Sequence, residues 1–172
     1  RYAVEQGASV INLSLGLACP SRIIEDEIES AMAAGANVVA AAGNSGSDEA
    51  FYPASDSLAL SVTALDSADV RAEFATIHAT VDVAAPGMGL ISSFHDGQYA
   101  LGAGTSFSAP LIAGQCALIR QIDPSRGPMA VAGSVRSGVI DIYGIEQNLP
   151  FVDKLGTGRM DGVTTLANLI SA

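Results

Sequence analysis

A serine and an asparagine, at positions 106 and 44, are the side chains best suited to act together in chemistry. Ser106 stands between small residues at the start of the apolar run "LGAGTSFSAPLIAGQCALI". In the first turn of a helix it would lie beside backbone N–H groups without intrahelical partners, at the positive end of the helix dipole. A developing oxyanion is stabilised in such a place. Ser106 is therefore either a nucleophile or a residue that only caps a helix.

Asn44 follows a short apolar segment that ends in Gly43, within "AAAGNSG". Ligands of open parallel sheets gather at the carboxyl ends of the strands. An amide side chain at that edge can donate a hydrogen bond to an oxyanion, which a serine nucleophile requires. An asparagine after a glycine is also a common turn residue. Both interpretations of Asn44 stay open on the residues alone.

Short apolar segments bounded by turn residues predict buried strands, and their near-continuous apolarity favours a parallel sheet covered on both faces. These segments are residues 9–16, 37–44, 58–65 and 80–87. A helix is expected over residues 21–35, with Ser21 as its cap and Gly35 at its end. The expected fold is therefore α/β, with three layers: a mainly parallel sheet and helices on both faces.

The second half of the chain predicts a hairpin and further helices. Residues 89–102 form the hairpin, which turns at Asp96 and Gly97. The expected helices cover residues 106–120, 128–139 and 161–171. Because the first of them is apolar on every face, it is expected to be buried. The connections at 44–58 and 65–80 are long loops, of the kind that often carries function.

The composition indicates one folded domain, because 172 residues with 49% hydrophobic side chains can bury a core. Eight basic residues stand against 18 acidic ones, and the net charge of −10 argues against nucleic acid and anionic membranes as partners. No apolar run approaches the roughly 20 residues that span a bilayer. Cys19 and Cys116 lack metal-ligand spacing. They are expected to be free thiols, one of them in the core.

The motifs around both candidate residues resemble those of the subtilisin-like serine proteases. "GTSFSAP" resembles the serine motif of that family, and "VVAAAGNSG" resembles its oxyanion-asparagine segment. Further counterparts are "VINLSLG", "YPAS", "VAAPG" and "GTGRMDG". The resemblance implies a subtilisin-like fold that lacks its N-terminal strands, with residues 1–172 forming part of one catalytic domain.

The resemblance also implies roles for individual residues. Ser106 would attack a peptide carbonyl and form an acyl-enzyme, while Asn44 and the Ser106 N–H group form the oxyanion hole. An extended polypeptide substrate would place the side chain that precedes the scissile bond in a roomy, apolar pocket, and specificity would be broad. The residues implied in substrate binding are Ser14, Leu15, Gly16, Ala41, Ala42, Gly43 and Thr105.

The family's triad runs Asp, His, Ser along the chain, and only nine residues precede Val10. We therefore expect the aspartate and the histidine to lie on a missing N-terminal segment, and this chain alone to be inactive. His78 and His95 match neither motif and are expected to be surface or loop residues. The sheet would have an open edge beside "VINLSLG", and we expect either self-association through it or pairing with a separately supplied N-terminal piece.

No cofactor is expected for the chemistry. By resemblance, Asp82 and the Ala54 carbonyl could form part of a weak cation site, for which a structural calcium ion is possible, although a strand-end aspartate is usually only solvated. The resemblance implies a secreted or extracytoplasmic protein. One alternative is a non-catalytic module that keeps the fold. Another is an α/β-hydrolase esterase, which is disfavoured because Ser108 replaces the last glycine of the Gly-x-Ser-x-Gly motif.

Overall fold

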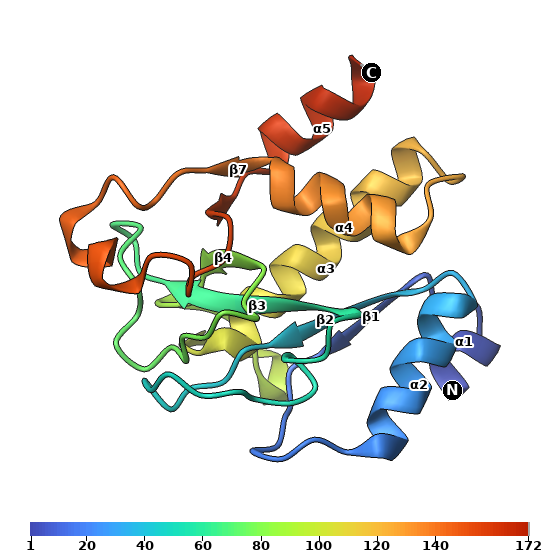
Figure 1. Ribbon diagram of the computed structural model, residues 1–172, viewed down its shortest axis with the longest axis horizontal. Coiled ribbons are helices and arrows are strands. Elements are labelled where there is room, and N and C mark those ends of the chain that lie inside the picture. The colour runs from blue at the N-terminus through green and yellow to red at the C-terminus, as the bar shows by residue number, and fades with distance from the viewer. Residues whose placement is uncertain (172) are drawn as a thin grey trace.

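The computed structural model describes residues 1–171 and has three layers, a sheet between two sets of helices (Figure 1). The strands of the main sheet are, in spatial order, β1 (Val10–Leu13), β2 (Asn37–Ala41), β3 (Ala59–Leu65), β4 (Val83–Pro86), β8 (Arg159–Met160) and β7 (Val139–Ile140). All neighbours pair in parallel except β7 and β8. The predicted α/β class with a mainly parallel sheet is confirmed.

Helices cover both faces of the sheet. One face packs against α3 (Thr105–Ile122) and α4 (Pro128–Ser137), and α5 (Gly162–Ile170) packs against these two helices. The other face packs against α2 (Arg22–Ala33) and the short α1 (Tyr2–Glu5). Two 3-10 helices, η1 (His95–Gly97) and η2 (Glu146–Phe151), lie in connections. Because helices cover both faces of the sheet, the strands in its middle need an apolar side chain at every position.

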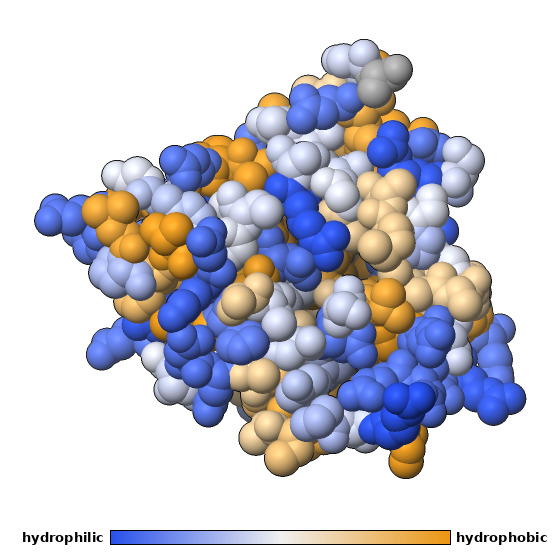
Figure 2. Space-filling model, in the orientation of Figure 1, coloured by the Kyte–Doolittle hydropathy of each residue, from blue (hydrophilic) through white to orange (hydrophobic). Residues whose placement is uncertain are grey.

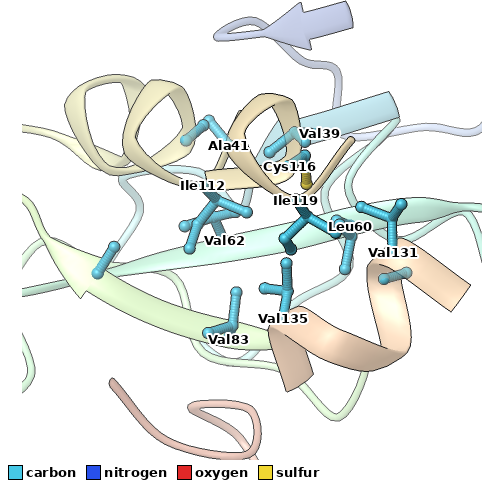
Figure 3. Close-up of a cluster of buried hydrophobic side chains, with 13 residues drawn as sticks. Val39, Ala41, Leu60, Val62, Val83, Ile112, Cys116, Ile119, Val131 and Val135 are labelled. Atoms are coloured by element: carbon cyan, nitrogen blue, oxygen red, sulfur yellow. The ribbon is translucent and has the colours of Figure 1, made fainter. Parts of the chain in front are cut away.

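The two central strands satisfy that need, since every residue of β2 and β3 is buried. Successive side chains of a strand point to opposite faces. Val39 and Val62 accordingly pack toward α3 and α4, whereas Val38 and Ala59 pack toward α2. Figure 3 shows the first of these two clusters. Two-sided burial explains why these strands read as unbroken apolar runs rather than as alternating patterns.

The long helix α3 is buried on one face only, so the expectation of burial on every face is wrong. Ile112, Cys116 and Ile119 face the sheet and α4 and are inaccessible to solvent. Leu111 and Leu118 lie on the other face, where Leu118 is 49% exposed. The reason is that the sheet and α4 contact a single side of the helix, and within residues 1–171 nothing covers the opposite side.

Both cysteines are free thiols, as predicted, with Cys19 exposed and Cys116 in the core. Burial raises the pKa of the Cys116 thiol to about 12. Cys116 therefore behaves as a small apolar side chain of α3.

Helix α2 begins directly after Ser21, but the predicted side-chain cap is absent. The Ser21 carbonyl accepts the first helical hydrogen bond, from Glu25 N at 3.0 Å, while its hydroxyl bonds to no amide of the first turn. At the other end, Gly35 has φ +91 and follows the last helical turn, as expected of a terminating glycine.

The predicted hairpin consists of β5 (Leu90–Ser93) and β6 (Tyr99–Gly102), which pair in antiparallel fashion. It turns where predicted, because Asp96 and Gly97 both have left-handed backbone angles, with φ 56 and φ 71.

The surface of the molecule is mixed in character: on the face seen in Figure 2, hydrophilic and hydrophobic residues are interspersed. In the described part of the chain, no helix has the length and apolarity to cross a membrane.

Asp161 caps α5 and gives a test of pH-dependent stability. Its carboxylate accepts hydrogen bonds from the Thr164 hydroxyl and the Val163 amide, and the Thr164 bond is the main cause of its lowered pKa. A lowered pKa in the folded state adds stability above the unfolded value of about 3.9, and this stability is lost as the pH falls through the folded value. Asp161→Asn should therefore destabilise at pH 7, with a difference from wild type that shrinks below about pH 4.

Chemical unfolding at a series of pH values measures this difference. Asp153→Asn is the matched control, because the Asp153 carboxylate accepts no hydrogen bond within residues 1–171 and an asparagine tolerates its φ of 64. A difference between Asp161→Asn and wild type that stays constant down to pH 3 would contradict the assigned role of the carboxylate.

Candidate active site

The ends of two parallel strands and the start of α3 meet at one edge of the sheet. Parallel strands carry their carboxyl ends on the same side, so the loops after β1 and β2 are brought together there. They surround a depression of about 460 Å³. Its lining consists of Ser14, Leu15 and Gly16 after β1, Ala41 at the end of β2, Gly43, Asn44 and Ser45 after β2, Phe51 from the following loop, and Thr105 and Ser106 from α3.

The Asn44 side chain is held in one orientation by Thr105. Asn44 Oδ1 accepts hydrogen bonds from Thr105 N at 2.9 Å and from Thr105 Oγ1 at 3.0 Å. A backbone N–H can only donate, so the oxygen of the amide must face Thr105. Thr105 is itself fully buried, and its Oγ1 also accepts from Gly43 N at 3.2 Å. The Asn44 Nδ2 donor is therefore directed away from Thr105.

Asn44 Nδ2 and the Ser106 amide border the same small space, which Gly104 leaves open. A Cβ atom on Gly104 would lie 3.3 Å from Asn44 Nδ2 and 3.8 Å from Ser106 N. Gly104 also has φ +141, a backbone conformation that disfavours other residues. Two N–H donors that lie this close together at one depression can hold a single oxygen atom that carries negative charge.

Ser106 is the second residue of α3, and its backbone is tied to the end of β1. Ser14 Oγ donates to the Ser106 carbonyl at 2.9 Å and accepts from Asn12 Nδ2 at 2.9 Å. The two histidines bond elsewhere, His78 Nδ1 to Thr80 Oγ1 and His95 Nδ1 to Asp96 Oδ2. The described residues therefore position the serine but bring no histidine into a hydrogen bond with it.

Of the nine residues predicted at the site, the structure brings eight into the lining of the depression. The exception is Ala42, which is buried and whose amide donates to the Val62 carbonyl at 3.0 Å. Ser45 and Phe51 also line the depression and were not predicted, although Phe51 directly precedes the "YPAS" segment, in a long loop of the kind that often carries function. Its position depends on how that loop folds back, for which the sequence has no local signal.

The Asp82 carboxylate does not fit the calcium site that the resemblance implies. One oxygen accepts from Arg136 Nε at 2.8 Å, and the other accepts from Ser61 N at 2.8 Å. A cation would have to compete with the arginine for the same carboxylate. Within residues 1–171, no group of three or more acidic, histidine or cysteine side chains is arranged to hold a metal ion.

Residues 1–139 match the sequence profile of the subtilase family, Peptidase_S8. The chain belongs to this family. It is similar to the thermophilic serine proteinase of Bacillus sp. (strain AK1), with 43% identity over 118 residues, which are 69% of this chain and 29% of the relative. It is similar to subtilisin BL of Lederbergia lenta, with 36% identity over 148 residues, which are 83% of this chain and 55% of the relative.

The structural comparison agrees with this subtilase assignment. A solved protease structure from Pseudoalteromonas arctica PAMC 21717 superposes with a TM-score of 0.84 at 28% identity, and covers 94% of this chain and 51% of that one. The subtilase chain described here spans between 29% and 55% of the two curated relatives. Its fold is subtilisin-like, as the motifs implied.

Proposed function

We propose that this subtilase chain carries the nucleophile and the oxyanion hole of a serine endopeptidase. The observation that supports the proposal most strongly is that Asn44 Nδ2 and Ser106 N both lie beside Gly104 at the start of α3, in residues that line one depression. Asn44 cannot turn its oxygen into that space without losing two hydrogen bonds to Thr105. The site is therefore preorganised to stabilise negative charge next to a serine hydroxyl.

In the proposed reaction, Ser106 Oγ bonds to the carbonyl carbon of the peptide while its proton passes to a general base. The carbonyl oxygen takes the negative charge and accepts hydrogen bonds from Ser106 N and Asn44 Nδ2. The C–N bond then breaks, and the amine leaves with the proton. Water hydrolyses the acyl-enzyme ester and restores the Ser106 hydroxyl. The chemistry requires no cofactor in this scheme.

The base would be a histidine, oriented by an aspartate, on a segment outside residues 1–172. In support of such a segment, β1 lies at the edge of the sheet and pairs only with β2 among the described strands. An open edge can accept a further strand, from that segment or from a second copy of this chain. We expect the isolated chain to be inactive because Ser106 lacks an activating base.

The substrate in this proposal is an extended polypeptide. The backbones after β1 and β2 end side by side at the depression, and Leu15 there is 57% exposed. Extended peptides bind such backbones mainly through main-chain hydrogen bonds. We also propose a location outside the cytoplasm, by analogy with the subtilase family.

Labelling with a fluorophosphonate probe tests the nucleophile. The complete protein should be labelled on Ser106, and Ser106→Ala should abolish both labelling and peptide hydrolysis. Ser125→Ala, which removes an exposed serine of the loop before α4, is the matched control and should retain both. Labelling of a different residue, or an unlabelled complete protein with no hydrolysis, would contradict the proposal and favour a non-catalytic subtilase-fold module.

A further inference from the structure

Phe51 occupies a place between the two backbone walls of the active-site depression. A Cβ atom on Gly16, in the wall after β1, would lie only 2.2 Å from a carbon of the Phe51 ring. A Cβ atom on Gly43, in the wall after β2, would lie 3.0 Å from the same ring. The ring thus touches both walls at positions where only a glycine leaves it room. The ring therefore occupies part of the space between the walls.

The loop that carries Phe51 is fixed to the wall after β1. The backbones of Leu17 and Tyr52 exchange two hydrogen bonds, with N–O distances of 2.6 and 2.8 Å. Phe51 itself is bonded to Ser55. Phe51 N donates to Ser55 Oγ at 3.1 Å, and Ser55 N donates to the Phe51 carbonyl at 2.8 Å. These four bonds fix the backbone at Phe51 and at the residue after it.

The pocket therefore differs from the roomy one that the small residues of both walls imply. Gly16 and Gly43 would leave a wide slot on their own, but the aromatic ring takes up part of it. A substrate side chain inserted between the walls would meet the ring edge or face. A methyl or hydroxymethyl group would need little of the remaining volume, whereas a benzyl group would need more of it and would compete with Phe51.

We propose that Phe51 restricts the residue before the scissile bond to small side chains, of the size of alanine or serine. This inference rests on the proposed peptidase function, and assigns its substrate class. Discrimination by volume in an apolar pocket amounts to about 10- to 200-fold between side chains that differ by a methylene or more. We therefore expect kcat/KM to favour alanine over phenylalanine at this position by at least about 10-fold.

Peptide nitroanilides that differ only in this residue, alanine or phenylalanine, test the inference on the complete protein. Phe51→Ala should lower the alanine-to-phenylalanine ratio of kcat/KM by about 10-fold or more, chiefly through faster cleavage of the phenylalanine substrate. Phe94→Ala, which removes an exposed ring from the hairpin, is the matched control and should leave the ratio unchanged. A wild-type protein that cleaves both substrates equally would overturn the inference while leaving the peptidase function intact.

A binding measurement separates the inference from catalysis. In Ser106→Ala, calorimetry with two product peptides that end in alanine or phenylalanine should show tighter binding of the alanine peptide. This readout needs neither a reactive serine nor a folded Phe51 variant. Equal binding, or tighter binding of the phenylalanine peptide, would refute the assigned role of Phe51. If the alanine peptide binds more tightly but the complete protein hydrolyses no peptide, the peptidase function is refuted and the role of Phe51 in the pocket is supported.

Discussion

Asn44→Ala is expected to lower kcat for peptide hydrolysis by about 100- to 1,000-fold and to change KM little; this range was measured on subtilisin, a member of the same family. The physical reason is that Asn44 Nδ2 borders the space shared with Ser106 N, where charge develops in the transition state. The carbonyl oxygen of the bound substrate carries less charge, so the lost hydrogen bond matters less before the reaction.

Steady-state kinetics of the complete protein separate these two effects. Asn168→Ala is the matched control, because it removes an exposed amide of α5 that lies outside the depression, and it should leave both constants unchanged. A raised KM with an unchanged kcat would show that Asn44 binds the ground state as well as the transition state. Unchanged constants in Asn44→Ala would remove the oxyanion hole from the proposed mechanism.

The sequence predicted those parts of the fold that have a strong local pattern. The central strands β2 and β3 were recognised because burial on both sides requires an apolar residue at every position. The two-residue strands β7 and β8 were missed, since two residues are too few to show any periodicity. The exposed face of α3 was also missed, because its leucines are as apolar as its buried residues.

The candidate site divides in the same way. Asn44 and Ser106 stand in contiguous motifs whose residue types already indicate their chemistry, and both line the depression. Phe51 became visible only in three dimensions. Its place depends on the pairing of Leu17 with Tyr52, a contact between loops that are distant along the chain. No periodicity or spacing in the sequence predicts such a pairing.

Ile112→Ala is expected to lower the free energy of unfolding by about 2–5 kcal/mol. Ile112 is inaccessible to solvent and lies on the face of α3 that packs on the sheet, where it belongs to the same cluster as Ala41 and Val62 (Figure 3). Truncation removes the apolar contacts of three carbon atoms and leaves a cavity that the close-packed strands cannot fill. The loss is a large fraction of the roughly 5–15 kcal/mol that stabilises a typical domain.

Denaturant unfolding measures this loss, with Ser106→Ala as the common background so that no sample digests itself. Ile170→Ala is the matched control, because it makes the same truncation at a side chain that is 75% exposed at the end of α5, and it should change stability by no more than about 0.5 kcal/mol. Similar losses in both variants would contradict the central place of α3 in the core. A large loss at Ile112 alone would show that α3, the helix that carries Ser106, depends on its contact with the sheet for stability.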